Sequence, residues 1–237
     1  MRNYFIFGGV WSSDFGVFIS GANTFNAASR DFETVTIKGR DGVLTLDNGR
    51  FNEVDHNYSA FILDNFDSNI SAFRNAIMSL RGMQRLTDSY HPGEFYRAYY
   101  GSGLEPDVLP NLRHGSFDVT FTRDPRRFLT SGEIMITKYS DESTFTIENP
   151  TPYACRPLIR VYGEGVLGVN GEPIKINFAP NAYTEIDSEL QEIYYETTNL
   201  GMYVELAEFP VLAPGTNNFT ASGDIIRVSV TPRWFIL

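Results

Sequence analysis

The chain has 237 residues and a formal net charge of −10, with 42% hydrophobic and 20% charged side chains. This length and composition are typical of a globular chain with one large domain or two modest ones, and they exclude a disordered protein. The negative charge argues against a broad nucleic-acid-binding surface, because neutralising phosphates needs clustered Lys and Arg.

Short runs of aromatic and β-branched residues predict a mainly β fold. In the first part of the chain, strands are expected at 4–7, 15–20, 33–38 and 53–63, separated by turns that contain Gly, Asn and Ser. Residues 1–11 hold only a brief apolar run, which we interpret as the first strand rather than a signal peptide. No run reaches the ~20 apolar residues of a membrane helix. We therefore expect synthesis and folding in the cytoplasm, without a membrane partner.

Residues 35–51 predict a projecting hairpin. Two turn signals, Arg40-Asp-Gly42 and Asp47-Asn-Gly49, leave one short and stiff strand between them. Charges of both signs at the corners suit docking onto a complementary neighbour; these are Arg40, Asp41, Asp47 and Arg50. An ordinary surface hairpin with solvated charges is the alternative interpretation.

One amphipathic helix is expected next. Asp67 or Ser68 can cap its start, and Gly82 can end it in the left-handed conformation. Its apolar stripe is expected to cover one face of the N-terminal sheet; the stripe consists of Ile70, Phe73, Ile77 and Leu80.

Further strands are expected at 83–88, 94–100 and 116–122, with a Gly- and Pro-bearing loop at 101–111. A polar corner then ends this sheet, and it contains Arg123, Arg126 and Arg127. Gly and Pro residues in 131–152 indicate a junction between domains. We place the boundary near residue 140, which gives an N-terminal domain of residues 1–140 and a C-terminal domain of residues 141–237.

The C-terminal domain is expected to be a β-sandwich or jelly roll, because short strand-like runs follow one another at close spacing without a helix. These runs are 143–148, 157–163, 166–169, 174–178, 183–187, 192–195, 202–206, 217–221 and 225–231. Residues 1–140 carry a net charge of −2 and residues 141–237 carry −8. The two domains are therefore expected to face different surroundings.

No catalytic, cofactor or metal site is expected. His56, His91 and His114 stand in unrelated contexts without the spacing of metal ligands. Cys155 is the only cysteine, so it cannot form an internal disulfide, and we interpret it as a small buried thiol.

Two alternatives come from the C-terminal half. Its many carboxylates could include a glycosidase pair, although a solvated acidic face explains them as well. Tyr194, Tyr195 and Trp234 could form a sugar-stacking platform, or they could belong to the core. The platform would make the chain a monomeric carbohydrate-binding β-sandwich protein.

Six motifs, taken in order along nearly the whole chain, resemble those of the distal tail protein (Dit) family of siphophages, especially phages of Gram-positive hosts. The motifs are Gly39–Leu46 with Gly49–Phe51, Tyr90–Glu94, Phe121–Phe128 with Ser131-Gly132, Asn149–Thr151, Arg156–Gly163 and Pro232–Phe235. Each motif alone is weak, and the ordered set is specific.

The resemblance implies a structural, non-enzymatic protein of the virion tail tip or baseplate. The expected fold is a tail-tube-like N-terminal β domain with one α-helix, followed by a galectin-like C-terminal β-sandwich. The family forms a homohexameric ring at the distal end of the tail tube. This hub joins the major tail protein of the tube to the tail-associated protein and to receptor-binding proteins in host adsorption, and DNA passes through its lumen without specific binding.

A cyclic ring needs an element that meets a different patch on the next subunit. The 40–50 hairpin is the candidate for that element, with Arg40, Asp41, Asp47 and Arg50 at its corners. The candidate recipients are the 70–80 helix and the corner with Arg123, Arg126 and Arg127. An acidic lumen would repel DNA phosphates and so avoid trapping the genome.

Overall fold

The computed structural model describes residues 2–22, 24–108, 113–139, 143–177, 179 and 181–237. The chain forms two compact units, Met1–Arg127 together with Leu237, and Phe128–Ile236. The division lies earlier than the expected boundary near residue 140, which itself falls outside the described residues. It lies earlier because β12 (Ile136–Tyr139) pairs with β22 (Arg227–Thr231), far along the second unit.

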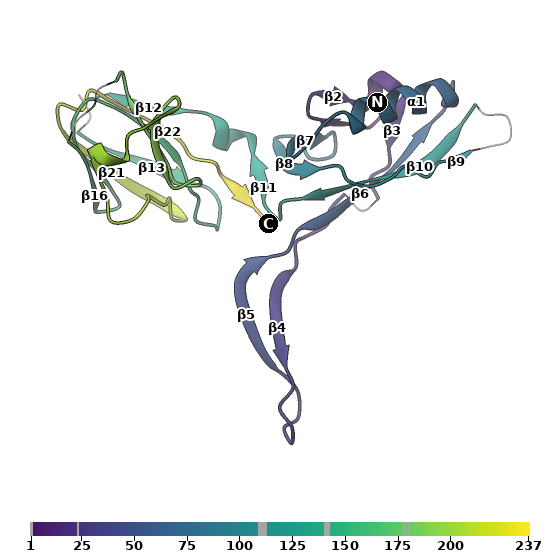
Figure 1. Ribbon diagram of the computed structural model, residues 1–237, viewed down its shortest axis with the longest axis horizontal. Helices are drawn as coiled ribbons and strands as arrows, with labels where there is room; N and C mark the ends of the chain where they lie inside the picture. The colour runs from purple at the N-terminus through teal and green to yellow at the C-terminus, as the bar shows by residue number, and fades with distance from the viewer. Residues whose placement is uncertain (1, 23, 109–112, 140–142, 178, 180) are drawn as a thin grey trace. The chain divides into compact units, whose positions relative to one another are not determined.

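The N-terminal unit is built on an antiparallel sheet (Figure 1). The strands lie in the order β2 (Val10–Trp11), β1 (Phe5–Phe7), β7 (Gln84–Asp88), β8 (Glu94–Tyr99), β10 (Gly115–Arg123), β6 (Val54–Ile62) and β3 (Val17–Ile19). The short strand β9 (Asp107–Val108) also pairs with β10, and a 3-10 turn (Ser12–Phe15) precedes β3. The expected mainly β fold is therefore confirmed.

Alternation along β6 and β10 separates a buried face of this sheet from an outward face. In β6, Val54, His56, Tyr58, Ala60 and Ile62 are buried, while the residues between them are not. Strand β10 follows the same pattern. Side chains of a strand point alternately to opposite faces, so only one face of this sheet carries the core.

Helix α1 (Phe66–Met78) covers the buried face with the predicted stripe. Ile70, Phe73 and Ile77 belong to the core, and Leu80 packs beside it after the helix has ended. Gly115 allows the close approach, because a Cβ there would lie 2.3 Å from the Phe66 ring.

The predicted ends of the helix were wrong by a few residues. The helix begins after Asn65, which adopts the left-handed conformation, and Asp67 and Ser68 lie inside the first turn. It ends at Met78, with Ser79 as the C-cap, rather than at Gly82. Local hydrogen bonds to backbone carbonyls fix the start, since Ser68 donates to Asn65.

Strands β4 (Arg30–Val35) and β5 (Leu44–Phe51) form a separate two-stranded sheet, which we call the arm (residues 30–51). Figure 1 shows it as a long ribbon with no other strand beside it. The signal Asp47-Asn-Gly49 was wrongly predicted to be a turn. It is a bulge inside β5, where the register shifts between Arg30 and Phe32 and Gly49 adopts a φ of 71°.

The C-terminal unit contains two sheets that share one core, so it is a β-sandwich as expected. The six-stranded sheet has the order β12, β22, β14 (Leu158–Tyr162), β17 (Thr184–Asp187), β18 (Glu192–Tyr195), β19 (Thr198–Asn199). The five-stranded sheet has the order β13 (Thr144–Asn149), β21 (Gly215–Gly223), β15 (Gly165–Val169), β16 (Glu172–Ile176), β20 (Val204–Glu205).

The closing strand belongs to neither sheet of the sandwich. Strand β23 (Phe235–Ile236) pairs with β11 (Arg127–Leu129), which begins at the division between the units. Trp234 lies in the sandwich core, and Phe235 stacks on Tyr153 at 5.5 Å. Short 3-10 turns, Thr130–Glu133 and Gly201–Tyr203, connect neighbouring strands. Among the described residues, no helix is long and apolar enough to cross a membrane.

Candidate functional site

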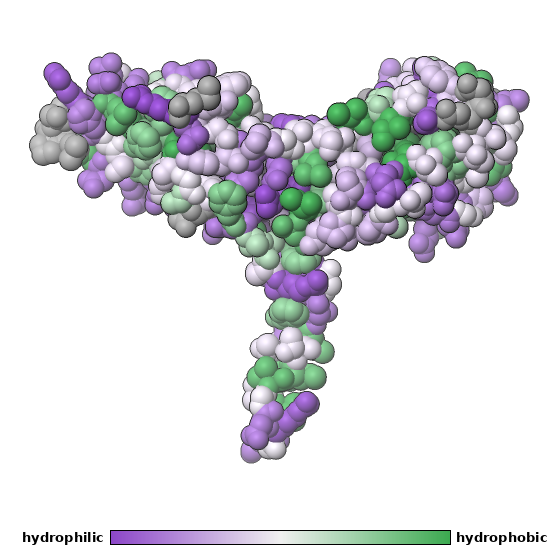
Figure 2. Space-filling model, turned by 180° about the vertical axis from the view of Figure 1, so that it is seen from behind, coloured by the Kyte–Doolittle hydropathy of each residue, from purple (hydrophilic) through white to green (hydrophobic). Residues whose placement is uncertain are grey.

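The arm leaves apolar side chains uncovered. Phe32, Val35, Leu44 and Leu46 expose between 39% and 50% of their surface. Neither core cluster of the described residues includes an arm residue, and Figure 2 shows apolar patches alternating with polar ones along the arm. An isolated two-stranded hairpin is marginally stable in water. Such an arm is expected to be covered by a partner.

Three of these four apolar residues share one face of the arm, and Phe32 lies on the other face, opposite Asp47. Val35 lies opposite Leu44, and Leu46 follows two residues along β5, so the three side chains share a face. Thr34 lies opposite Thr45 on the other face. One face of the arm therefore has three apolar side chains beside Glu33, and the other has Phe32 among polar residues.

The predicted charges near the arm's root bond within the arm itself. The guanidinium of Arg30 lies 3.4 Å from Asp47, and that of Arg50 donates to Asp31 at 2.6 Å. The hydrogen bond from Arg50 lowers the pKa of Asp31. Arg30, Asp47 and Arg50 are exposed, so solvent screens both pairs, and they orient the arm's surface more than they stabilise it.

Arg40 and Asp41 lie between the strands, at the tip of the arm. Both residues are exposed, and Gly39 and Gly42 on either side have positive φ angles. The tip therefore presents one positive and one negative side chain on a tight turn, as the hairpin prediction required.

Arg123 does not lie on the surface, which corrects its predicted role as a recipient. Its side chain is 0% exposed, its guanidinium lies 4.6 Å from the Tyr96 ring centroid, and Nη2 donates to the Asn26 carbonyl at 2.7 Å. Nη1 donates to the carbonyls of Asp124 and Pro125. Because Asn26 precedes β4, Arg123 fastens the root of the arm to the sheet.

The other two corner arginines are partly exposed and form ion pairs within the chain. Arg126 binds the Asp124 carboxylate with two nitrogens, at 2.9 and 2.7 Å. Arg127 donates to Glu94 at 2.6 Å. Although burial opposes it, hydrogen bonding from Arg126 lowers the pKa of Asp124.

A buried polar cluster lies beside Arg123. The His56 ring packs between Tyr58 and Tyr96, with centroid distances of 4.6 and 5.2 Å. Within the described part of the chain, neither ring nitrogen of His56 has a hydrogen-bond partner. Asp88 accepts hydrogen bonds from the Tyr58 hydroxyl at 2.7 Å and from His91 Nδ1 at 2.9 Å. The cluster is buried, so we interpret it as structural.

We expect the stability of the chain to fall in acid because of His56. Burial, with a smaller contribution from Arg123, lowers the pKa of His56 to about 4 from 6.5. The unfolded chain then binds the proton first, so the free energy of unfolding decreases as the pH falls from about 6.5 to about 4. The shift corresponds to at most about 3 kcal/mol.

Urea unfolding at pH 7 and pH 4.5 measures this effect. His56→Phe should reduce the difference between the free energies of unfolding at pH 7 and pH 4.5. Phe cannot bind a proton, and the substitution loses no hydrogen bond. His114→Gln, at a partly exposed histidine whose Nδ1 bonds the Leu63 carbonyl, is the control and should leave this difference in unfolding free energy unchanged. An unchanged pH dependence in His56→Phe would show that the burial of His56 does not cause the acid effect.

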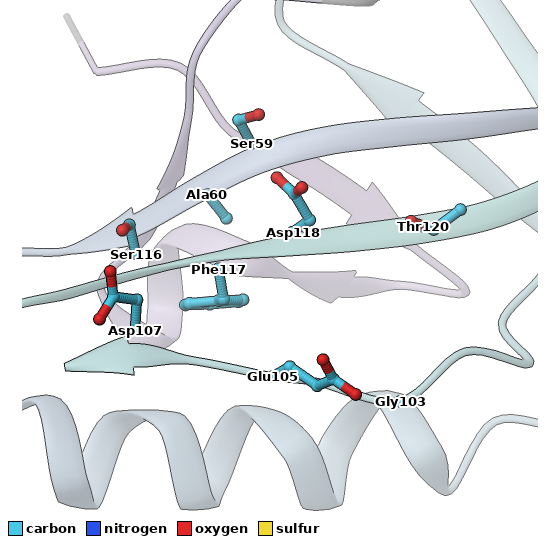
Figure 3. A pocket seen from close by; sticks show the side chains of 9 residues that line it. All are labelled: Ser59, Ala60, Gly103, Glu105, Asp107, Ser116, Phe117, Asp118 and Thr120. Carbon is cyan, nitrogen blue, oxygen red and sulfur yellow. The ribbon is translucent and has the colours of Figure 1, made fainter.

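The outward face of β6 and β10 is polar and acidic. Ser59 lies opposite Asp118, and Thr122 donates to Asp55. The face includes a hollow of about 510 Å³, lined in part by the loop before β9 and by Asp107. Figure 3 shows Asp107 beside Ser116 and the carboxylate of Asp118 on the same side of the strands.

The described residues hold no group of three or more His, Cys, Asp or Glu that could bind a metal ion. Cys155 is buried, and its thiol donates to the Tyr153 carbonyl at 3.5 Å. In the C-terminal unit, Glu185 pairs with Arg160 at 2.6 Å, and Asp187 pairs with Arg233 at 2.7 Å. These two carboxylates are thus held by arginines.

The three aromatic residues considered for a sugar platform lie in different places. Trp234 belongs to the sandwich core, and Tyr195 packs against that core. Tyr194 lies opposite Glu185 on the outward face of the six-stranded sheet. Tyr194 and Tyr195 are neighbours in one strand and point to opposite faces, and the sequence could not say which face would meet the core.

No family model and no curated protein matches the chain. Among solved structures, the chain is similar to SPP1 Dit (gp 19.1), with a TM-score of 0.74, 13% sequence identity and 100% coverage of both chains. That protein is described as a paradigm of the hub adsorption apparatus in phages that infect Gram-positive bacteria. The similarity shows a shared fold, so the resemblance to distal tail proteins is confirmed at the level of the fold.

Proposed function

We propose that the protein is a structural, non-enzymatic hub of a siphophage tail tip. The observation that carries this proposal is the fold shared with SPP1 Dit over the full length of both chains. The ordered sequence motifs support it independently of the fold. The proposed location is the distal end of the tail tube in the virion, after synthesis in the cytoplasm of the host bacterium.

In this proposal the N-terminal unit forms a homohexameric ring through the arm. The apolar face of the arm, with Val35, Leu44 and Leu46, docks onto the next subunit, and the charges at its tip fix the register. The recipient is the exposed side of α1 around Arg74 and Met78, together with the corner at Arg126 and Arg127. Arg123 is left out because it is buried.

The outward face of β6 and β10 would line the lumen of the ring. It carries hydroxyl and carboxylate groups, among them Asp55 and Asp118, and neither strand places a Lys or Arg on it. A surface of this kind repels phosphates. DNA would then pass without specific binding.

The proposed partners are the major tail protein, the tail-associated protein and receptor-binding proteins. The two faces of a ring differ, so each can bind a different neighbour. The galectin-like C-terminal sandwich would lie outside the ring and present receptor-binding proteins during host adsorption.

Light scattering on a sizing column, with negative-stain images of the same peak, tests the ring. We expect a mass of about six times the 26.8 kDa of the chain and images with a central hole. A chain that stays monomeric at every concentration, and also when mixed with its major tail protein, would contradict the proposal.

A further inference from the structure

The outward face of the six-stranded sheet carries a cluster of tyrosine and arginine side chains. Tyr162, Tyr183 and Tyr194 are half-buried and do not belong to the sandwich core. Arg160 lies 5.1 Å from the Tyr183 ring centroid, and Arg227 lies 3.5 Å from that of Tyr162. Tyrosine and arginine are the residue types that dominate binding surfaces.

Strand pairing brings these side chains into neighbouring rows. Arg160 lies opposite Glu185, and Glu185 lies opposite Tyr194 on the next strand. Tyr162 and Tyr183 are in contact, with ring centroids 5.4 Å apart. The aromatic rings and the Arg160–Glu185 ion pair therefore form one continuous patch across three strands.

A hollow lies at the end of this patch, along β18 and β19. It has a volume of about 480 Å³ and is lined in part by Tyr194, Glu192, Glu196 and Asn199. Tyr194 lies opposite Asn199, so the hollow is on the same outward face. Its volume is within the range of small-ligand sites, about 300–1,000 Å³.

The charges on the patch favour a neutral ligand. Glu185 is 5% exposed and accepts a hydrogen bond from Arg160 Nε at 2.6 Å, which neutralises both groups. The carboxylates of Glu192 and Glu196 at the hollow would repel an anionic polymer. Planar carboxylate, guanidinium and amide groups can bond to neighbouring hydroxyls, and tyrosine rings offer apolar faces to the C–H side of a sugar ring.

We propose that this patch and hollow bind a neutral, hydroxyl-rich glycan. Tyr194 is the stacking platform at the hollow, Arg160 and Asn199 bind the hydroxyl groups, and the buried Glu185 holds Arg160 in place. The site lies on one sheet of one sandwich, so it is complete in a single chain and does not depend on the proposed ring.

An array of neutral and anionic oligosaccharides, probed with the full-length protein, tests the proposal. Calorimetry with the neutral oligosaccharide that binds best then measures the affinity. We expect Tyr194→Ala to weaken binding at least about tenfold, as expected for a central aromatic contact, and Glu185→Gln to weaken it as well. Thermal unfolding and solution mass should match the unmodified protein.

Tyr139→Ala is the matched control. Tyr139 lies opposite Arg227 on the same face, 59% exposed, but at the far edge of the sheet from β18. This variant should keep full affinity. The proposal is overturned if no neutral oligosaccharide binds, if only anionic ones bind, or if Tyr194→Ala and Tyr139→Ala have equal effects. None of these outcomes contradicts the proposed hexameric ring, because the solution mass tests the ring separately.

Discussion

Replacing Val35, Leu44 and Leu46 together by serine is expected to dissociate the proposed hexamer into single chains. All three side chains share one face of the arm and are exposed in the isolated chain. A neighbouring subunit that covers the remaining 39–45% of each side chain would contribute about 0.6–1.3 kcal/mol per residue. Losing about 2–4 kcal/mol weakens each interface about 30- to 1,000-fold.

Light scattering across a concentration series measures this change, and circular dichroism checks the fold. The sheet and helix should remain intact, because these side chains do not belong to either core. The double variant Thr34→Ser and Thr45→Ser is the control on the opposite face of the arm and should keep the full mass. A triple variant that still forms hexamers would show that another surface holds the ring together.

Arg123→Ala is expected to destabilise the N-terminal unit by about 3 kcal/mol, in the range for breaking a buried hydrogen-bond network. The change removes the donors to the carbonyls of Asn26, Asp124 and Pro125 and the contact with the Tyr96 ring. Burial lowers the pKa of Arg123, so relief of the buried charge offsets part of the loss.

Urea unfolding followed by circular dichroism measures this destabilisation, and limited proteolysis reports on the root of the arm. Cleavage between residues 20 and 30 should become faster, because Nη2 of Arg123 no longer binds the Asn26 carbonyl. Arg126→Ala, at a partly exposed ion pair, should cost less than about 1 kcal/mol. Equal stability of Arg123→Ala and the unmodified protein would show that the buried guanidinium does not fasten the arm.

Most strands and the helix were predictable because their patterns are local. The alternation of Ser116–Thr122 and the stripe at Ile70, Phe73 and Ile77 each repeat with the period of the element they form. Ends were less predictable, since Asn65 and Ser79 depend on hydrogen bonds within single turns.

The arm shows how much a turn signal can mislead. Asp-Asn-Gly has the composition of a tight turn, yet Gly49 supplies its positive φ to a bulge within a strand that continues to Phe51. The pairing of β5 with β4 decides whether this segment is a tight turn or a bulge, and that pairing joins residues up to 21 positions apart.

Arg123 was predicted to be an exposed corner residue from its polar neighbours, and the sheet buries it completely. Tyr194 and Tyr195 are adjacent in sequence, but only Tyr194 lies on the patch beside the hollow. In both cases a distant strand decides which side chains are covered.

The sequence by itself determined the mainly β class, the helix α1 and the resemblance to distal tail proteins, because each follows from local periodicity or from short motifs in order. The tertiary structure alone decided the order of strands, the burial of His56 and Arg123, the apolar face of the arm and the tyrosine patch. These features arise where strands far apart in the chain meet, and burial depends on that meeting rather than on the residue types alone.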